Sequence, residues 1–184
     1  MNNNRNGRKM HSSDMTQVGV ICAVLCILSP WAIVLPISPV PISFSLIAIY
    51  LSVYLVGYRK ALLGCVLYLF LGAIGLPVYA GGMAGIGRLF GPTGGYLFGY
   101  LAVIWVFGLL GEGRGKKWMQ SGAMVIGLLC LYAIGTVWLM VQTKMTVSAA
   151  LMAGVVPYII ADILKILFVT VLGDRIRKRL GNCY

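Results

Sequence analysis

Long hydrophobic segments separated by short polar connections make up most of the chain. Each segment holds about 16–26 residues, the length that an α-helix needs to cross roughly 30 Å of hydrocarbon, whereas barrel strands would show alternating segments of about 10 residues. The pattern predicts an all-α integral membrane protein with six transmembrane helices in one bundle. The expected spans are residues 15–35, 42–58, 61–76, 96–110, 118–142 and 157–173.

Prolines and charges mark the expected ends of these spans. Residues 36–41 form the first outer loop, because the prolines in this stretch lack the N–H donor that a helix needs. Arg59-Lys60 is expected to be the turn between the second and third spans. Pro157 is favoured at the first position of the last helix. The apolar residues 147–156 before it are expected at the outer membrane interface.

The least regular region is a glycine-rich outer loop, residues 77–95, between the third and fourth helices. Irregular backbone cannot face lipid, because unsatisfied peptide groups are tolerated at membrane depth only inside protein or along a cavity. Many of its other residues are apolar or aromatic, which argues against a loose connector. The region is therefore either an exposed loop or the wall of a re-entrant site.

The composition agrees with a membrane protein: 60% of the residues are hydrophobic and 10% charged, with a mean hydropathy of +0.92. The net charge of +11 would suggest a nucleic-acid partner in a soluble protein. Here the basic residues gather in alternate connections, so membrane topology explains the excess and no nucleic acid is expected. These residues are Arg5, Arg8, Lys9, Arg59, Lys60, Arg114, Lys116, Lys117, Arg175, Arg177, Lys178 and Arg179.

The positive-inside rule places these basic connections and both termini in the cytoplasm. We therefore expect a multi-pass plasma-membrane protein. Residues 1–14 and 179–184 would be cytoplasmic tails, and residues 15–178 would form one membrane domain in the lipid bilayer.

Asp162 and Lys165 interrupt the last apolar segment. A spacing of three places both side chains on one helix face. An ionisable side chain at mid-bilayer costs about 2.5–3.5 kcal/mol on insertion scales, so it tends to face a partner, the bundle interior or a wet cavity. The pair therefore indicates a functional site. The alternative is a membrane assembly or signalling subunit in which the two charges form only a structural ion pair.

Taken together with Arg88 of the glycine-rich loop, this pair suits a small organic anion with polar ends. Lys165 or Arg88 could bind an acid group, and Asp162 could accept hydrogen bonds from amide or ureido N–H groups. Aromatic side chains could cover an apolar body of the ligand. The candidate aromatics are Tyr79, Tyr96, Tyr132, Trp138 and Tyr158.

Catalytic patterns are missing from the sequence. It has no second intramembrane acid, histidine pair, Ser–His–Asp set or nucleotide-binding loop, so an intramembrane enzyme is disfavoured. The five cysteines lack the paired spacing of a metal site, and we expect neither a metal nor a cofactor. Without an energy source of its own, a transporter of this kind would depend on a partner.

Several motifs, in matching order and spacing, resemble the BioY family, the biotin-specific S components of energy-coupling factor (ECF) transporters. They are Pro39-Val40-Pro41, Gly75-Leu76-Pro77-Val78-Tyr79-Ala80-Gly81-Gly82, Gly91-Pro92-Thr93-Gly94-Gly95-Tyr96-Leu97, Gly135-Thr136-x-Trp138-Leu139 and Gly154-Val155-x-Pro157-Tyr158-x-x-x-Asp162-x-x-Lys165. The resemblance covers about residues 15–178.

The resemblance implies a six-helix subunit that binds biotin near the outer membrane face. Asp162 and Lys165 would then contact the polar parts of biotin. The motifs that match would supply the nearby wall, from Ser43, Tyr79, Gly81, Gly91, Thr93, Tyr96 and Tyr158. Arg88 is added on its charge and position rather than on the resemblance.

Two departures leave a close analogue such as dethiobiotin as an alternative ligand. The family commonly has Thr and Gln where this chain has Ser43 and Ser45, so one hydroxyl is kept and one amide is lost. Some members also carry Asn at the position of Gly81.

The resemblance further implies a transmembrane coupling subunit and two ATP-binding subunits as partners. Small residues of the first helix would dock them, and the matching positions are Gly19, Cys22, Ala23 and Cys26. Small residues at four-residue spacing allow close helix approach, which serves internal packing equally well.

Overall fold

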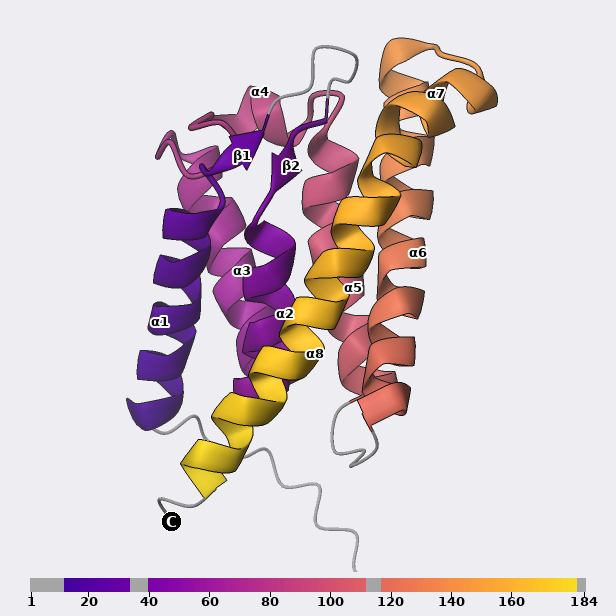
Figure 1. Cartoon of the computed structure of the whole chain (residues 1–184). Helices are drawn as coiled ribbons and strands as arrows, with labels where there is room; N and C mark the ends of the chain where they lie inside the picture. Colours follow the sequence, from indigo (N-terminus) through magenta and orange to yellow (C-terminus); the bar gives the residue numbers. More distant parts are fainter. Residues whose placement is uncertain (1–11, 34–39, 112–116, 182–184) are drawn as a thin grey trace, which may run out of the picture.

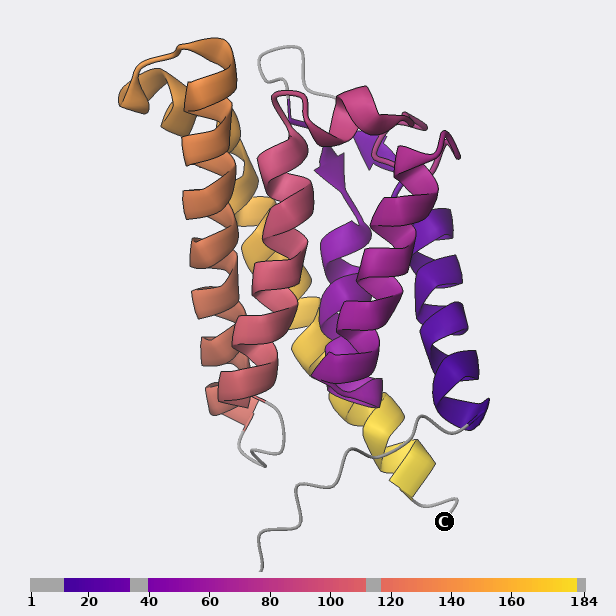
Figure 2. The same ribbon diagram turned by 180° about the vertical axis from the view of Figure 1, so that it is seen from behind.

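The computed structural model describes residues 12–33, 40–111 and 117–181 of the chain. The long helices α1, α2, α3, α5, α6 and α8 form one bundle, and the shorter elements lie at one end of it (Figures 1 and 2). The elements are α1 (Ser12–Leu28), β1 (Ala32–Ile33), β2 (Ile42–Ser43), α2 (Ser45–Val56), α3 (Tyr58–Ala73), α4 (Ile86–Leu89), α5 (Gly94–Gly111), α6 (Lys117–Thr143), α7 (Val147–Gly154), the 3₁₀ turn η1 (Val156–Tyr158) and α8 (Ile159–Gly181).

The all-α prediction is confirmed, and β1 and β2 form only a two-stranded antiparallel pair. Among the described residues, three segments are long and apolar enough to cross a membrane: Gly94–Gly111, Trp118–Thr143 and Val147–Gly173. Helix α2 has 12 residues and is therefore about 18 Å long, less than the roughly 30 Å of a hydrocarbon core.

Several predicted boundaries were wrong. The first helix ends at Leu28 rather than Leu35, because Pro30 already prevents its continuation. Arg59 and Lys60 belong to the first turn of α3, and the break before it is made by Gly57, whose φ of 92° is readily adopted only by glycine.

The last helix also differs from its prediction. Pro157 lies in η1, so α8 begins at Ile159 and continues beyond Gly173 to Gly181. The preceding apolar stretch forms α7, where the Thr146 side chain caps the helix by accepting from the Ala149 N–H at 3.4 Å.

Some predicted features lie outside the described residues. These are most of the N-terminal tail with Arg5, Arg8 and Lys9, the first part of the outer loop with Pro36 and Pro39, the connection with Arg114 and Lys116, and the final residues 182–184.

Helix α8 separates its side chains by face in the way a membrane helix at the edge of a bundle does. Its buried face carries Asp162, Lys165, Ile166 and Val169. Between residues 159 and 171 its exposed face is apolar, with Ile160, Ile163, Leu164, Leu167, Phe168 and Val171, and Arg175 is exposed further along the helix. The spacing of three and four residues gives one face to the bundle and leaves the other for lipid.

The connection between α3 and α5 is a structured cap on the bundle. Tyr79 and Met83 form an isolated antiparallel bridge, and α4 adds one helical turn. The Gly81 N–H donates to the Pro30 carbonyl at 3.2 Å, and the Gly85 N–H donates to the Gly72 carbonyl at 2.7 Å. This end of the bundle lies opposite the ends of α1 and α8 at Ser12 and Gly181 (Figure 1).

Candidate ligand-binding site

Two adjoining pockets open at the capped end of the bundle. The first has a volume of about 400 Å³ including its open mouth, and the second about 340 Å³. They share the wall residues Val40, Pro41, Ser43, Tyr96 and Tyr100. The two pockets are therefore neighbouring parts of one site.

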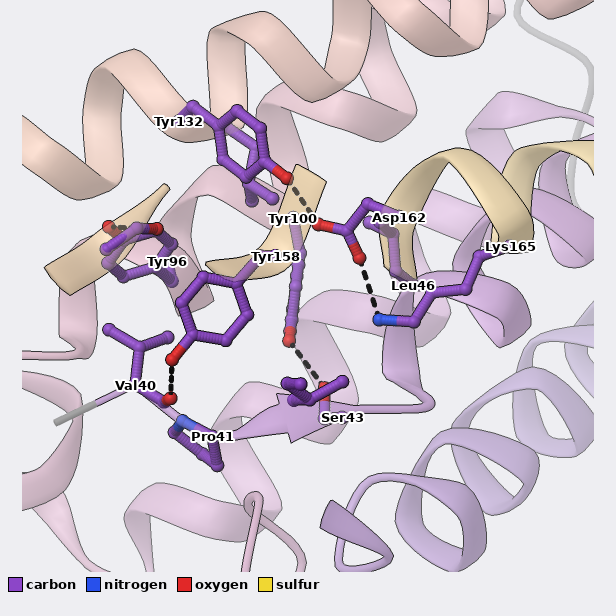
Figure 3. Close-up of a pocket in the computed structure, with 13 residues that line it drawn as sticks. Val40, Pro41, Ser43, Leu46, Tyr96, Tyr100, Tyr132, Tyr158, Asp162 and Lys165 are labelled. Carbon is purple, nitrogen blue, oxygen red and sulfur yellow. Dashed lines mark hydrogen bonds and ion pairs between the residues drawn. The ribbon is translucent and has the colours of Figure 1, made fainter. Parts of the chain in front are cut away.

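Asp162 and Lys165 line the first pocket, and both are buried, at 5% and 9% exposure. The Lys165 Nζ donates to Asp162 Oδ1 at 2.7 Å, and the Tyr132 hydroxyl donates to Oδ2 at 2.7 Å (Figure 3). An ammonium has three N–H donors and a carboxylate about four acceptor positions. The pair is thus electrically neutral while keeping donors and acceptors for a ligand.

Arg88 lines the second pocket from α4 and is half-buried. Burial lowers the pKa of its guanidinium, because the charged form loses hydration there. Of the acidic side chains that the structure describes, Asp162 pairs with Lys165, and Asp14 pairs with Lys60 at 2.6 Å. Within the described part of the chain Arg88 therefore has no acidic partner, and the second pocket favours an anionic group.

Tyrosine rings form the apolar walls between these charged groups. Their hydroxyls are engaged within the protein, apart from any ligand: Tyr79 donates to the Leu69 carbonyl, Tyr96 to the Gly154 carbonyl, Tyr132 to Asp162 and Tyr158 to the Val40 carbonyl, while Tyr100 bonds with the Ser43 hydroxyl. Because these polar atoms are satisfied, the rings offer mainly apolar surface to the pockets.

A chain of serine hydroxyls supports the shared wall. The Ser43 Oγ donates to the Ser45 Oγ at 3.0 Å, and the Ser45 Oγ donates to the Ser29 Oγ at 2.7 Å. The chain joins β2 to the end of α1. Ser45 therefore acts behind the pocket, and only Ser43 lines it.

Most of the predicted site residues come together, since Ser43, Tyr79, Arg88, Thr93, Tyr96, Tyr158, Asp162 and Lys165 line one pocket or both. Gly81 and Gly91 line neither. Gly81 is exposed, with a φ of 76°. The Gly91 carbonyl accepts a hydrogen bond from the Trp138 indole.

The four small residues of α1 divide between two faces. Gly19 and Ala23 are exposed, and a Cβ added at Gly19 would have open space around it. Cys22 is 4% exposed and belongs to the hydrophobic core, with Cys26 packed partly against that core. Gly19 and Ala23 therefore lie on the exposed face of α1, while Cys22 serves internal packing.

The sequence analysis did not assign several wall residues to the site. Val40, Pro41 and Gly154 lie in the motifs that carry the family resemblance, whereas Leu46, Tyr100 and Leu131 lie outside them. Tyr132 was noted only as one aromatic among several, yet it holds the Asp162 carboxylate. Apolar residues in an apolar chain carry no signal that separates pocket from core.

Two glycines, one in α6 and one in α7, leave the space that the Tyr96 side chain occupies. A Cβ at Gly135 would overlap the Tyr96 ring, and one at Gly154 would overlap its hydroxyl. We expect Gly135→Ala to lower stability by about 1–3 kcal/mol through overpacking and to weaken ligand binding. Gly122→Ala on the same helix is the control, because its Cβ would meet open space. Thermal unfolding of both variants tests this, and equal melting temperatures would contradict it.

The chain is a helical membrane bundle with a charged, tyrosine-lined pocket at one end. This is the architecture of a membrane subunit that binds a substrate. The fold is similar to that of the crystal structure of an S-component for biotin from an ECF-type ABC transporter, with a TM-score of 0.83, 24% identity and coverage of 92% of this chain and 95% of that one. A second S component of a bacterial ECF transporter matches with a TM-score of 0.58 at 14% identity, covering 94% and 98%.

The chain belongs to the BioY family, whose family model matches residues 1–182. It is 36% identical to the biotin transporter BioY2 of Lactococcus lactis, covering 91% of this chain and 92% of that relative. It is 32% identical to the biotin transporter BioY of Thermotoga maritima, covering 89% and 95%. This membership confirms the predictions of a membrane transport protein rather than an enzyme.

Proposed function

We propose that this chain is the biotin-binding membrane subunit of a vitamin uptake transporter, energised by separate coupling and ATP-binding subunits. The observation that carries the proposal is the separation of charge in the site. A neutral Asp162–Lys165 pair lines one pocket, and tyrosine rings separate it from Arg88, which lines the adjoining pocket and has no acidic partner among the described residues. Biotin has the same sequence of groups: a neutral ureido ring, an apolar body and chain, and a carboxylate.

This charge distribution also supports a proposed orientation of the ligand. Asp162 accepts from a ureido N–H, and Lys165 donates to the ureido carbonyl, because the pair is already neutral and would gain little from an added anion. Arg88 binds the carboxylate, since a guanidinium can form two parallel hydrogen bonds with that group. The carboxylate in turn supplies the negative charge that the described surroundings of Arg88 lack.

The proposed topology has six spans in the plasma membrane, with both termini cytoplasmic. Helix α1 begins, and helix α8 ends, at the same end of the bundle (Figure 1), and basic residues gather in the connections expected there. The pockets lie at the opposite end and would open to the external medium. Helix α2 is too short to span alone and would be completed by the β1–β2 pair above it.

The proposed partners are a transmembrane coupling subunit and two ATP-binding subunits. The exposed small residues Gly19 and Ala23 on α1 support close approach of a partner helix. Titrating a purified coupling complex against Ala23→Leu and wild type would test this contact.

Ligand-dependent stability is the direct test of the proposed function. A ligand that binds only the native state raises its stability by RT ln(1 + [L]/Kd), roughly 4 kcal/mol at a thousandfold excess over Kd. We expect biotin to raise the melting temperature of the detergent-solubilised protein, dethiobiotin to raise it less, and unrelated vitamins to leave it unchanged. Folded protein that responded to none of these ligands would refute the proposal and favour the structural ion pair.

A further inference from the structure

Two side chains of α6 are tied to the backbone that follows α4. The Trp138 Nε1–H donates to the Gly91 carbonyl at 2.9 Å, and the Gln142 Nε2–H donates to the Phe90 carbonyl at 2.9 Å. A spacing of four places both donors on one face of α6. Neither residue lines either of the two pockets described above, so contact with a ligand in those pockets does not explain this arrangement.

The indole of Trp138 is packed closely against the start of α5. A Cβ at Gly95 would overlap the Trp138 side chain, and one at Gly94 would lie 3.4 Å from its Nε1. Phe98 packs against the indole with ring centroids 5.7 Å apart, and against Phe90 at 6.1 Å. Glycines at the start of α5 therefore admit the indole, and aromatic contacts hold it over the chain that it bonds.

These contacts act on Arg88 because α4 is only one helical turn. A helix of four residues is not stable by itself, so its position depends on outside anchors. One anchor precedes it, where the Gly85 N–H donates to the Gly72 carbonyl at 2.7 Å. The other follows it at Phe90 and Gly91, whose own N–H groups bond back to Ile86 and Arg88.

We propose that Trp138 and Gln142 are positioning residues for Arg88, and that through it they determine the preference of the site for ligands with an acid group. This inference rests on the proposed function and deepens it. The two side chains hold the carbonyls of Phe90 and Gly91, which fixes α4 and aims the guanidinium into the second pocket. Their loss leaves the Asp162–Lys165 end of the site unchanged.

The first measurement needs no ligand. Amide hydrogen exchange of residues 86–94 is compared among the wild type, Trp138→Phe and Gln142→Leu, with Trp118→Phe as control. Trp138→Phe keeps an aromatic ring but removes the donor, and Trp118 lies on the same helix with 71% of its surface exposed. We expect exchange to become about 5–30-fold faster in the first two variants and to stay unchanged in the control. Unchanged exchange in both variants would overturn the inference.

The second measurement compares affinity for biotin and for biotin methyl ester, which lacks the negative charge. We expect Trp138→Phe to weaken the binding of biotin at least about threefold and to leave the affinity for the ester unchanged. In a protein that already carries Arg88→Gln, we expect Trp138→Phe to cause no further loss of affinity. Equal weakening of both ligands, or an effect that adds to that of Arg88→Gln, would show a general structural role and overturn the inference. A wild type that bound neither ligand would instead refute the proposed function. The hydrogen-exchange measurement would still test whether Trp138 and Gln142 hold α4 in place.

Discussion

Asp162→Asn is expected to weaken biotin binding by about 10–150-fold. Asparagine keeps the size of the side chain and can still accept from Tyr132, but it removes the charge that strengthens the bond to a ureido N–H. Hydrogen bonds to charged groups contribute about 1.5–3 kcal/mol, which corresponds to this range of affinity. Isothermal titration of the purified protein measures the change directly.

The same substitution leaves the Lys165 ammonium buried without its anion. Breaking a buried ion pair in this way costs about 3–5 kcal/mol of stability, so lost binding must be separated from lost folding. The double variant Asp162→Asn/Lys165→Met removes both charges and is expected to regain most of the stability without regaining affinity. Asp14→Asn is the matched control, because it breaks the other described ion pair, that with Lys60, far from the pockets.

The alternative of a purely structural ion pair makes a different prediction for the exchanged pair Asp162→Lys/Lys165→Asp. If the two charges only stabilise each other, the exchanged protein should bind biotin as the wild type does. A folded exchanged protein with unchanged affinity would contradict the assignment of Asp162 to the ureido ring.

Arg88→Gln is expected to weaken the binding of biotin by about 30-fold or more, while the affinity for biotin methyl ester stays nearly unchanged. Truncating one partner of a buried, hydrogen-bonded charge pair costs about 2–5 kcal/mol of affinity. The free protein should be as stable as the wild type or slightly more stable. This follows because the substitution removes a half-buried charge that has no acidic partner among the described residues.

Competition binding with the acid and its ester measures this difference, and thermal unfolding without ligand measures the stability. Arg59→Gln is the control, since Arg59 is exposed at the opposite end of the bundle, where it lies over the Tyr58 ring. If Arg88→Gln weakened the acid and the ester equally, the carboxylate would have to be assigned elsewhere, with Lys165 as the remaining cation in the pockets.

Much of the fold could be predicted because its signals are local. The spans expected at residues 96–110 and 118–142 agree closely with α5 and α6, since hydropathy and helix period depend on neighbouring residues. The errors fell where a single residue overrode the pattern. Pro30 ended α1 early, and Gly57 made the turn that had been assigned to Arg59 and Lys60.

The candidate site was predictable where a side chain was costly to bury. Asp162 and Lys165 were conspicuous for that reason, and their spacing alone placed them on one face of a helix. Tyr100 and Leu131 also line the first pocket, but nothing in an apolar segment distinguishes such residues from ordinary core.

By itself, the sequence determined that this is a helical membrane protein with an ion pair on one face of its last helix, because both properties arise from residues close together in the chain. Only the tertiary structure decided that Arg88 faces a pocket adjoining that pair, that Tyr132 holds Asp162, and that Cys22 is internal. These outcomes depend on how residues distant in sequence pack against one another, and hydropathy and spacing carry no record of that packing.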